Sequence, residues 1–241
     1  MARSRDDEGF DLGAAVTRSL LGWGVVAGIF YLMVGVTQGL LRDGFSFAEH
    51  PLSLLMLGDF GWVQQTNLIL TGLMVTAAAV GLQRAMKPNK RATRTGIALG
   101  IYGLALIGAG IFAPDPVDGF PEPSSTAEAT TNGVVHLAFG GVGFIALAVA
   151  AFFISGWYRE RNETASAGRA RWAGLVILIG FLGGAALATD TVGVILLWIA
   201  VLTGWVWLAF TSRRLYQVVP HPDLHVRQAA GMDPISSQDP A

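Results

Sequence analysis

The residues of this chain that could do chemistry are two histidines with several carboxylate and amide side chains, close to the ends of long apolar segments. The candidate ligand-binding residues are His50, Asp59, Asn67, Asp115, Asp118 and His136. Histidine and carboxylate groups can hold Zn²⁺ with a free position for water, as in hydrolytic zinc sites. If the protein binds a metal, we expect His50, Asp115 and His136 to be its ligands.

The spacing of these three residues has no local signature such as the two histidines of HExxH. The simplest interpretation of His136 is a hydrogen bond to a loop carbonyl or to Asp115, which would hold the adjoining loop in place. Asp115 lies between Pro114 and Pro116, whose rings favour an extended chain and end the preceding helix. We therefore expect no cofactor and no bound metal, with Zn²⁺ as the alternative.

The elements that must position these residues are apolar and long. Apolar residues make up 52% of the chain and charged residues only 14%, well below the roughly 25% of a soluble domain. The formal net charge of −1 does not favour nucleic acid as a partner. Cysteine is absent, which excludes disulfides, thiolate metal ligands and a cysteine nucleophile. The composition indicates an integral membrane protein in contact with the lipid bilayer.

The apolar runs predict an all-α bundle of six transmembrane helices, because each run is long enough to cross a hydrocarbon core of about 30 Å. The first run is too long for a signal peptide, so we interpret it as an uncleaved span. The last two could instead form a re-entrant pair, and Pro51–Gly58 could form an interfacial or re-entrant helix. The predicted spans are residues 19–41, 62–82, 96–113, 133–155, 172–188 and 192–211.

Three regions follow from this pattern: an N-terminal tail at 1–17, the transmembrane domain at 18–214 and a mobile C-terminal tail at 215–241. Of the 16 Lys and Arg residues, only Arg42 lies in a segment that follows the first, third or fifth predicted span; we call these the outer segments. The other basic residues lie near the two termini and in the links after the second and fourth spans. The positive-inside rule therefore predicts that both termini are cytoplasmic in a plasma membrane. The acids of the outer segments are Asp43, Glu49, Asp59, Asp115, Asp118, Glu122, Glu128 and Asp190.

The interior of the spans is notable for small and uncharged residues. No Asp, Glu, Lys or Arg lies deep in any predicted span, whereas ion-coupled transporters usually place a charge there. A coupled transporter is therefore disfavoured. Glycines four residues apart allow helices to approach closely in lipid, which predicts a compact bundle. These pairs are Gly24/Gly28, Gly35/Gly39, Gly96/Gly100 and Gly180/Gly184.

Two stretches carry a resemblance to a known family. The first is HPLSLLMLGDFGWVQQTN, from His50 to Asn67, and the second is GAGIFAPDPVDGFP, from Gly108 to Pro121, followed by His136. Through them the core resembles the six-span prokaryotic membrane proteins of domain-of-unknown-function family 998. The resemblance implies a six-helix membrane fold but no activity. Members often have a second histidine near Asn132, and its absence here counts against a metal site.

The sequence leaves several functions open. We favour a non-enzymatic membrane protein that binds a small or lipid-like ligand, or a protein partner, at an acidic outer mouth lined by Asn67, Asp115 and His136. The alternative is a metal-dependent membrane hydrolase, similar in logic to ceramidase-type enzymes, in which His50 and His136 converge with a carboxylate. Haem binding by the two histidines would require them to face each other across a flat cavity.

Overall fold

The computed structural model describes residues 10–117, 119–121, 129–188 and 190–224, and this part of the chain forms an all-α bundle. Its six α-helices are joined by short segments at the terminal end and between α5 and α6, and by the longer segments 42–60 and 112–130; one 3₁₀ helix, η2, lies in the first of these longer segments. The helices are α1 (Leu12–Leu41), η2 (Leu52–Met56), α2 (Gly61–Met86), α3 (Lys90–Ile111), α4 (Thr131–Glu160), α5 (Thr164–Ala186) and α6 (Thr191–Val218).

All six α-helices are long and apolar enough to cross a membrane, which confirms the six-helix prediction. Several begin or end well beyond their apolar run. For example, α5 begins at Thr164 and α6 continues to Val218. A polar turn outside the hydrocarbon core still gains its backbone hydrogen bonds, so the helix does not stop where hydrophobicity does. The last two runs are both full-length helices rather than a short re-entrant pair.

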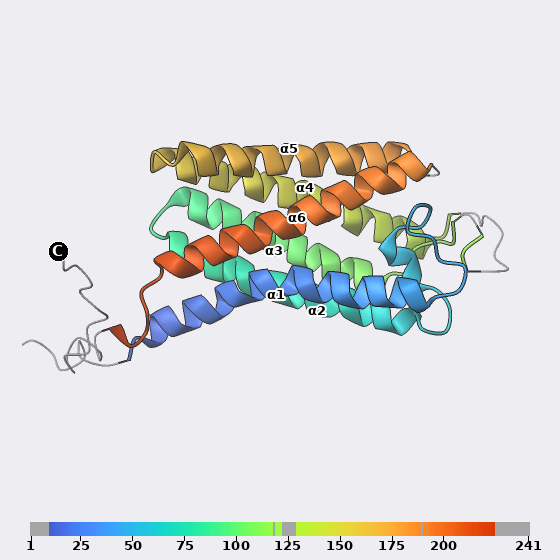
Figure 1. The fold of residues 1–241 in the computed structure, drawn as a ribbon, viewed down its shortest axis with the longest axis horizontal. Helices are drawn as coiled ribbons and strands as arrows, with labels where there is room; N and C mark the ends of the chain where they lie inside the picture. The colour runs from blue at the N-terminus through green and yellow to red at the C-terminus, as the bar shows by residue number, and fades with distance from the viewer. Residues whose placement is uncertain (1–9, 118, 122–128, 189, 225–241) are drawn as a thin grey trace, which may run out of the picture.

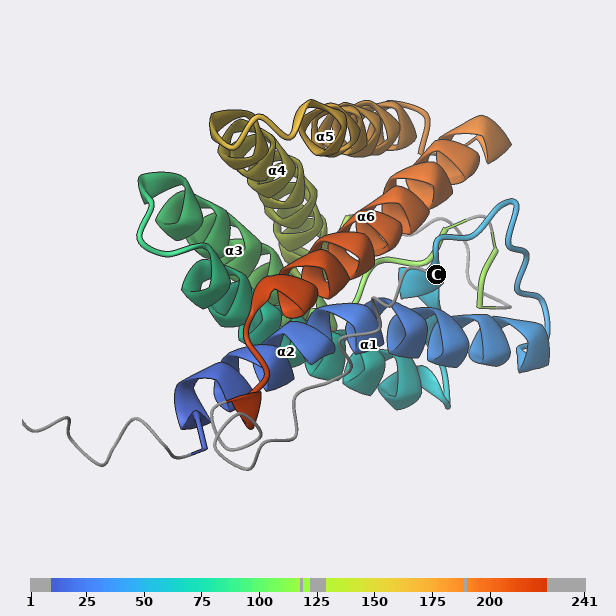
Figure 2. The same cartoon turned by 60° about the vertical axis from the view of Figure 1, so that its left-hand side comes forward.

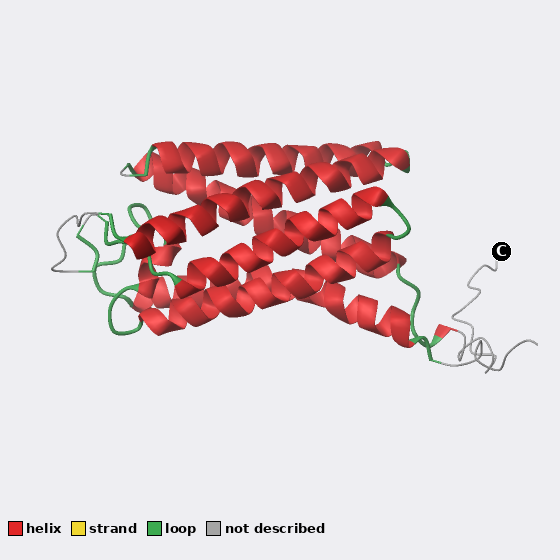
Figure 3. Cartoon of the chain, turned by 180° about the vertical axis from the view of Figure 1, so that it is seen from behind, coloured by secondary structure: helices red, strands yellow, loops and turns green. Residues whose placement is uncertain are grey.

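The helices pack in chain order, and α6 returns to contact both α1 and α2. Figures 1 and 2 show α6 crossing the bundle obliquely, so that it lies near α5 at its start and near α1 at its end. The even number of helices puts both ends of the described chain at one end of the bundle, here called the terminal end. Residues 42–60 and the described parts of 112–130 lie at the other, the loop end (Figure 3).

Small residues hold the helices close together, as the glycine spacing predicted. A Cβ atom built on Gly28 would lie 2.9 Å from the Trp205 side chain, and one on Gly72 would lie 2.5 Å from the Gly103 carbonyl oxygen. These positions join α1 to α6 and α2 to α3. Gly100 is different, because a Cβ atom there would meet nothing within 4 Å.

The loop between α1 and α2 is built around η2, whose apolar residues are buried against the two helices. Pro51 precedes this 3₁₀ helix, in agreement with a helix starting near that proline. Gln38 of α1 donates from Nε2 to the carbonyls of Leu55 and Phe60, at 3.2 and 2.9 Å. The predicted interfacial or re-entrant helix is therefore a short 3₁₀ helix that packs against α1 and α2 at the loop end.

The start of the region predicted as a mobile tail packs against the start of α1. Arg18 donates to the carbonyls of Tyr216 and Val219, and the backbone N–H of Asp11 donates to Pro222. Helix α1 itself begins at Leu12, inside the predicted N-terminal tail. The remainder of the two predicted tails, residues 1–9 and 225–241, lies outside the described residues.

Candidate ligand-binding cavity

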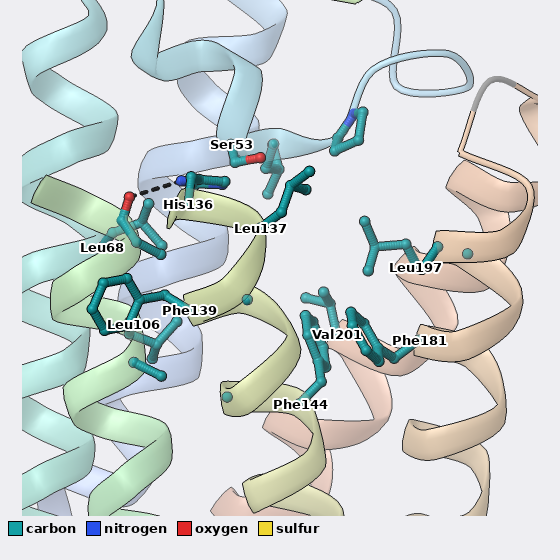
Figure 4. A pocket seen from close by; sticks show the side chains of 18 of the residues that line it. Ser53, Leu68, Leu106, His136, Leu137, Phe139, Phe144, Phe181, Leu197 and Val201 are labelled. Carbon is teal, nitrogen blue, oxygen red and sulfur yellow. Dashed lines mark hydrogen bonds between the residues drawn. The ribbon is translucent and has the colours of Figure 1, made fainter. Parts of the chain in front are cut away.

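A cavity of about 220 Å³ lies inside the loop-end half of the bundle, between α3, α4, α5 and α6, and η2 lies at its end. This volume far exceeds the roughly 10–15 Å³ that one water requires. Figure 4 shows Ser53 and His136 together at one end, with Phe144 and Phe181 further along the cavity. We call it the central cavity.

The central cavity exists because the ring of helices is not filled across its middle. In the described part of the chain, the backbones of α3 and α4 stay further from α6 than those of α1 and α5 do. Side chains cross only part of this space, as where the Tyr102 and Trp205 rings lie 5.9 Å apart. The walls facing this gap also include residues with little or no side chain: Ala105, Gly140, Gly143 and Gly184. The aromatic side chains of α4, α5 and α6 line the space without closing it.

His136 supplies the polar group at the loop end of the central cavity. Its Nδ1 atom lies 2.9 Å from the carbonyl oxygen of Ala109 and 2.8 Å from that of Phe112, both at the C-terminal end of α3. Because both neighbours can only accept, Nδ1 must carry the proton. In the neutral ring, Nε2 is then a hydrogen-bond acceptor. His136 thus bonds to backbone carbonyls, as predicted, but they belong to the last turn of α3 and its C-cap rather than to the loop beyond.

Three hydroxyl groups add to the polarity of the central cavity. Tyr31 of α1, Tyr102 of α3 and Ser53 of η2 all line it. Among the described residues, none of these hydroxyls has a hydrogen-bond partner. Trp198 also lines the cavity, but its Nε1 donates to the Phe47 carbonyl at 3.1 Å. A ligand could therefore meet hydroxyl donors as well as the His136 acceptor.

The central cavity reaches the surface of the bundle at the loop end. Leu137 of α4 is 70% exposed although it lines the cavity, and Ala185 and Ala188, at and just beyond the end of α5, are also exposed. Leu137 and Ala185 lie on helices that are long and apolar enough to span a membrane, whereas Ala188 lies in the turn after α5. The rim therefore includes both exposed helix surface and loop-end turns.

His50 is positioned by its own loop rather than by the central cavity. Its Nδ1 accepts a hydrogen bond from the Ser46 backbone N–H at 2.9 Å. The buried ring packs beside Phe45 and Phe120, with centroids 5.5 and 5.1 Å away. The Nε2 atom has no partner among the described residues. His50 thus belongs to an aromatic cluster that joins the two long loop-end segments.

Asp115 serves the start of α4. Its two carboxylate oxygens accept from the backbone N–H and the hydroxyl of Thr130, at 3.0 and 2.5 Å. Thr130 in turn is the N-cap of α4, and its Oγ accepts from the Gly133 N–H. A carboxylate beside a helix N-terminus is stabilised by the helix dipole. This arrangement accounts for Asp115 without a ligand.

Asn67 lies in the interior of the bundle. Its Nδ2 atom donates to the Tyr31 carbonyl of α1 at 3.1 Å and to the Gln64 side chain at 3.0 Å, while its Oδ1 accepts from Thr71. Asn67 does not line the central cavity. Asp59 is exposed in the loop before α2. Asp118 lies outside the described residues.

Of the predicted site residues, the structure places His136 at the central cavity, while Asn67 lies behind its wall and Asp115 at a helix cap. Within the described residues, no three His, Asp or Glu side chains are grouped so that they could hold a metal ion. The metal-dependent hydrolase and haem binding remain predictions from the sequence. The aromatic lining residues Tyr31, Tyr102 and Trp205 were not singled out as site residues, although hydroxyl and indole groups deep in spans could have indicated them.

The fold defines the class of this molecule: a multi-pass helical membrane protein with six spans. Residues 25–214 match the family described as Protein of unknown function (DUF998), and the chain belongs to that family. The match runs from the middle of α1 to near the end of α6 and agrees with the resemblance seen in the sequence. No curated protein and no solved structure matches the chain.

Proposed function

We propose that this protein is a non-enzymatic component of the plasma membrane that binds a lipid-like ligand in the central cavity, with both termini in the cytoplasm. One observation carries the proposal: a mainly apolar cavity with a polar end reaches the surface at the loop end, where the apolar Leu137 in its lining is exposed. Ligand pockets are typically apolar with a few polar groups that fix orientation. This cavity has that composition inside a membrane-spanning bundle.

The polar and apolar parts of the central cavity suggest the chemistry of its ligand. His136 Nε2 can accept from a hydroxyl or amide of the ligand head, and Ser53 lines the same end. The tail would lie along Phe144, Phe181 and Val201. A single-chain lipid with an uncharged hydroxylated head fits this pattern, because no Asp, Glu, Lys or Arg lines the cavity among the described residues.

A binding role accounts for these groups better than catalysis does. The Nδ1–H of His136 is held by two carbonyls, which leaves Nε2 to accept a hydrogen bond. The described lining offers no carboxylate, lysine or arginine that could act with it in an acid–base step. Asp115, the carboxylate predicted beside His136, is hydrogen-bonded to Thr130. The polar groups of the cavity are therefore suited to recognising a head group.

Filling the cavity tests the proposal. Gly140 lines the cavity, and a Cβ atom there would meet nothing within 4 Å, so Gly140→Leu should occupy ligand space without a backbone clash. Gly100→Leu is the matched control, since Gly100 is a half-buried helical glycine with equally open surroundings that does not line the cavity. The probe is a diazirine-bearing monoacylglycerol, cross-linked to the purified protein in detergent.

We expect Gly140→Leu to lower photolabelling of α4 and α6 by about tenfold, because overpacking a filled site costs about 1–3 kcal/mol. Gly100→Leu should label like the parent chain. Equal labelling of all three proteins, or labelling confined to the exposed outer surface, would contradict binding in the central cavity.

The orientation can be tested separately. Because the chain has no cysteine, single cysteines at the exposed positions Asp59 and Lys90 give clean reporters for the loop end and the terminal end. In intact cells, a membrane-impermeant maleimide should label Asp59→Cys and not Lys90→Cys. The reverse pattern would overturn the proposed orientation.

A further inference from the structure

A second pocket, of about 520 Å³, lies at the terminal end and is formed by the end of α4, the first turns of α5 and the last turns of α6. Figure 1 shows α6 diverging from α5 toward this end. Three arginines line the pocket: Arg169 of α5 and Arg213 and Arg214 of α6. We call it the arginine pocket.

The polarity of the arginine pocket changes with depth. Helix α5 runs inward from the terminal end, whereas α6 runs outward to it, so Ala173 and Val206 lie deeper than the arginines. The inner lining includes Ala173, Val206 and Phe210. Val206 is 56% and Phe210 68% exposed, on the side of a helix apolar enough to span a membrane. A cationic rim above an apolar groove matches the two parts of a phospholipid.

Arg214 is fixed in place by its neighbours. It forms an ion pair with Glu163, donates to the Ser166 hydroxyl at 2.7 Å, and its guanidinium lies 5.2 Å from the centre of the Tyr158 ring. These contacts join α4, α5 and α6. Arg214 therefore has a structural role in forming the pocket, and its charge is largely compensated.

The other two arginines are not compensated in this way. Arg169 donates only to Ser166, at 3.3 Å, and among the described residues neither Arg169 nor Arg213 pairs with a carboxylate. Both are exposed and both line the pocket. Two unpaired guanidinium groups from facing helices can converge on a tetrahedral anion, the geometry that arginine recognises well.

We propose that the arginine pocket binds the phosphate group of an anionic phospholipid from the leaflet at the terminal end. Arg169 and Arg213 contact the phosphate, and one acyl chain lies along Val206 and Phe210. Basic pockets between transmembrane helices are a known way to hold such head groups. The apolar groove favours a lipid over free phosphate as the source of this group. This site is separate from the central cavity and does not depend on its ligand.

Native mass spectrometry of the full chain released from detergent micelles tests the proposal, with phosphatidylglycerol and phosphatidylcholine of identical acyl chains as probes. The test variant is Arg169→Gln/Arg213→Gln, which leaves the Arg214–Glu163 pair intact. The matched control is Arg159→Gln/Arg171→Gln, which removes the same charge from exposed arginines at the same end that do not line the pocket. Inorganic phosphate is added as a competitor in a separate arm.

We expect the test variant to weaken phosphatidylglycerol binding by about tenfold or more, given the contribution of each basic residue near a membrane surface. The control should change it less than about twofold, and phosphatidylcholine binding should not respond. An equal loss in both double variants would show a general charge effect and overturn the site. Displacement of the lipid by millimolar phosphate would overturn the lipid as the ligand in favour of a soluble phosphate compound.

Discussion

The two ends of the bundle use their polar side chains in different ways. At the loop end, His136, Asp115 and Arg42 donate to or accept from groups of the loops and helix termini. At the terminal end, the Arg91–Glu160 and Arg214–Glu163 pairs join helices, but Arg169 and Arg213 have no such partner among the described residues. His136 and Asp115, which the sequence indicated as site residues, thus stabilise the fold. Arg169 and Arg213, which it did not indicate, keep an uncompensated charge.

The difference has a physical cause. Leaving a helix terminus or an irregular loop unsatisfied near the hydrocarbon is costly, so side chains at the loop end are drawn to backbone groups. At the terminal end, helices such as α5 and α6 continue past their apolar runs, to Thr164 and Val218. Polar turns outside the hydrocarbon core can keep a charge unpaired at lower cost. We therefore expect substitutions at the loop end to lower the free energy of unfolding, and substitutions of the unpaired arginines at the terminal end to lower lipid binding instead.

The largest stability effect is expected for His136→Ala. This change leaves the carbonyls of Ala109 and Phe112 without their donor, and we expect a loss of about 2–3 kcal/mol in the free energy of unfolding. His136→Gln should lose less, because an amide N–H can still donate. The measurement is SDS-induced unfolding in mixed micelles, with the exposed His221→Ala as control. If His136→Ala were as stable as the parent, the claim that His136 stabilises the loop end would be wrong.

A smaller loss is expected for Asp115→Ala. The substitution removes both acceptors of Thr130 and the negative charge beside the start of α4, which together should cost about 1–2 kcal/mol. Asp115→Asn keeps one carbonyl acceptor and should recover part of that loss. The same unfolding assay compares the two variants. If Asp115→Ala left stability unchanged but abolished ligand binding, Asp115 would belong to a site rather than to a cap.

The smallest effect on stability should come from Arg169→Gln/Arg213→Gln. Because these exposed side chains form no ion pair with the residues that the structure describes, the double variant should unfold within about 0.5 kcal/mol of the parent. Its phosphatidylglycerol binding should fall nonetheless. Stability that fell together with binding would place these arginines with the structural pairs and remove the contrast between the two ends.

Much of the fold was readable from the sequence, since it follows from local rules. A run of apolar residues long enough to cross the hydrocarbon must form a helix there, because lipid offers the backbone no other hydrogen-bond partner. The end of α3 follows from Pro114 and Pro116, and the close approach of α1 and α6 from Gly28. The distribution of Lys and Arg predicts an orientation by the same kind of local reasoning.

The sites were decided by the tertiary structure. The sequence predicted that His50, Asp115 and His136 lie at one end of the bundle, but not that each has a different backbone partner. The central cavity arises because α6 crosses obliquely and leaves the middle of the ring open, and the arginine pocket because α6 diverges from α5. Both depend on helix crossing geometry, which is set by packing among side chains far apart in the chain and not by any segment alone.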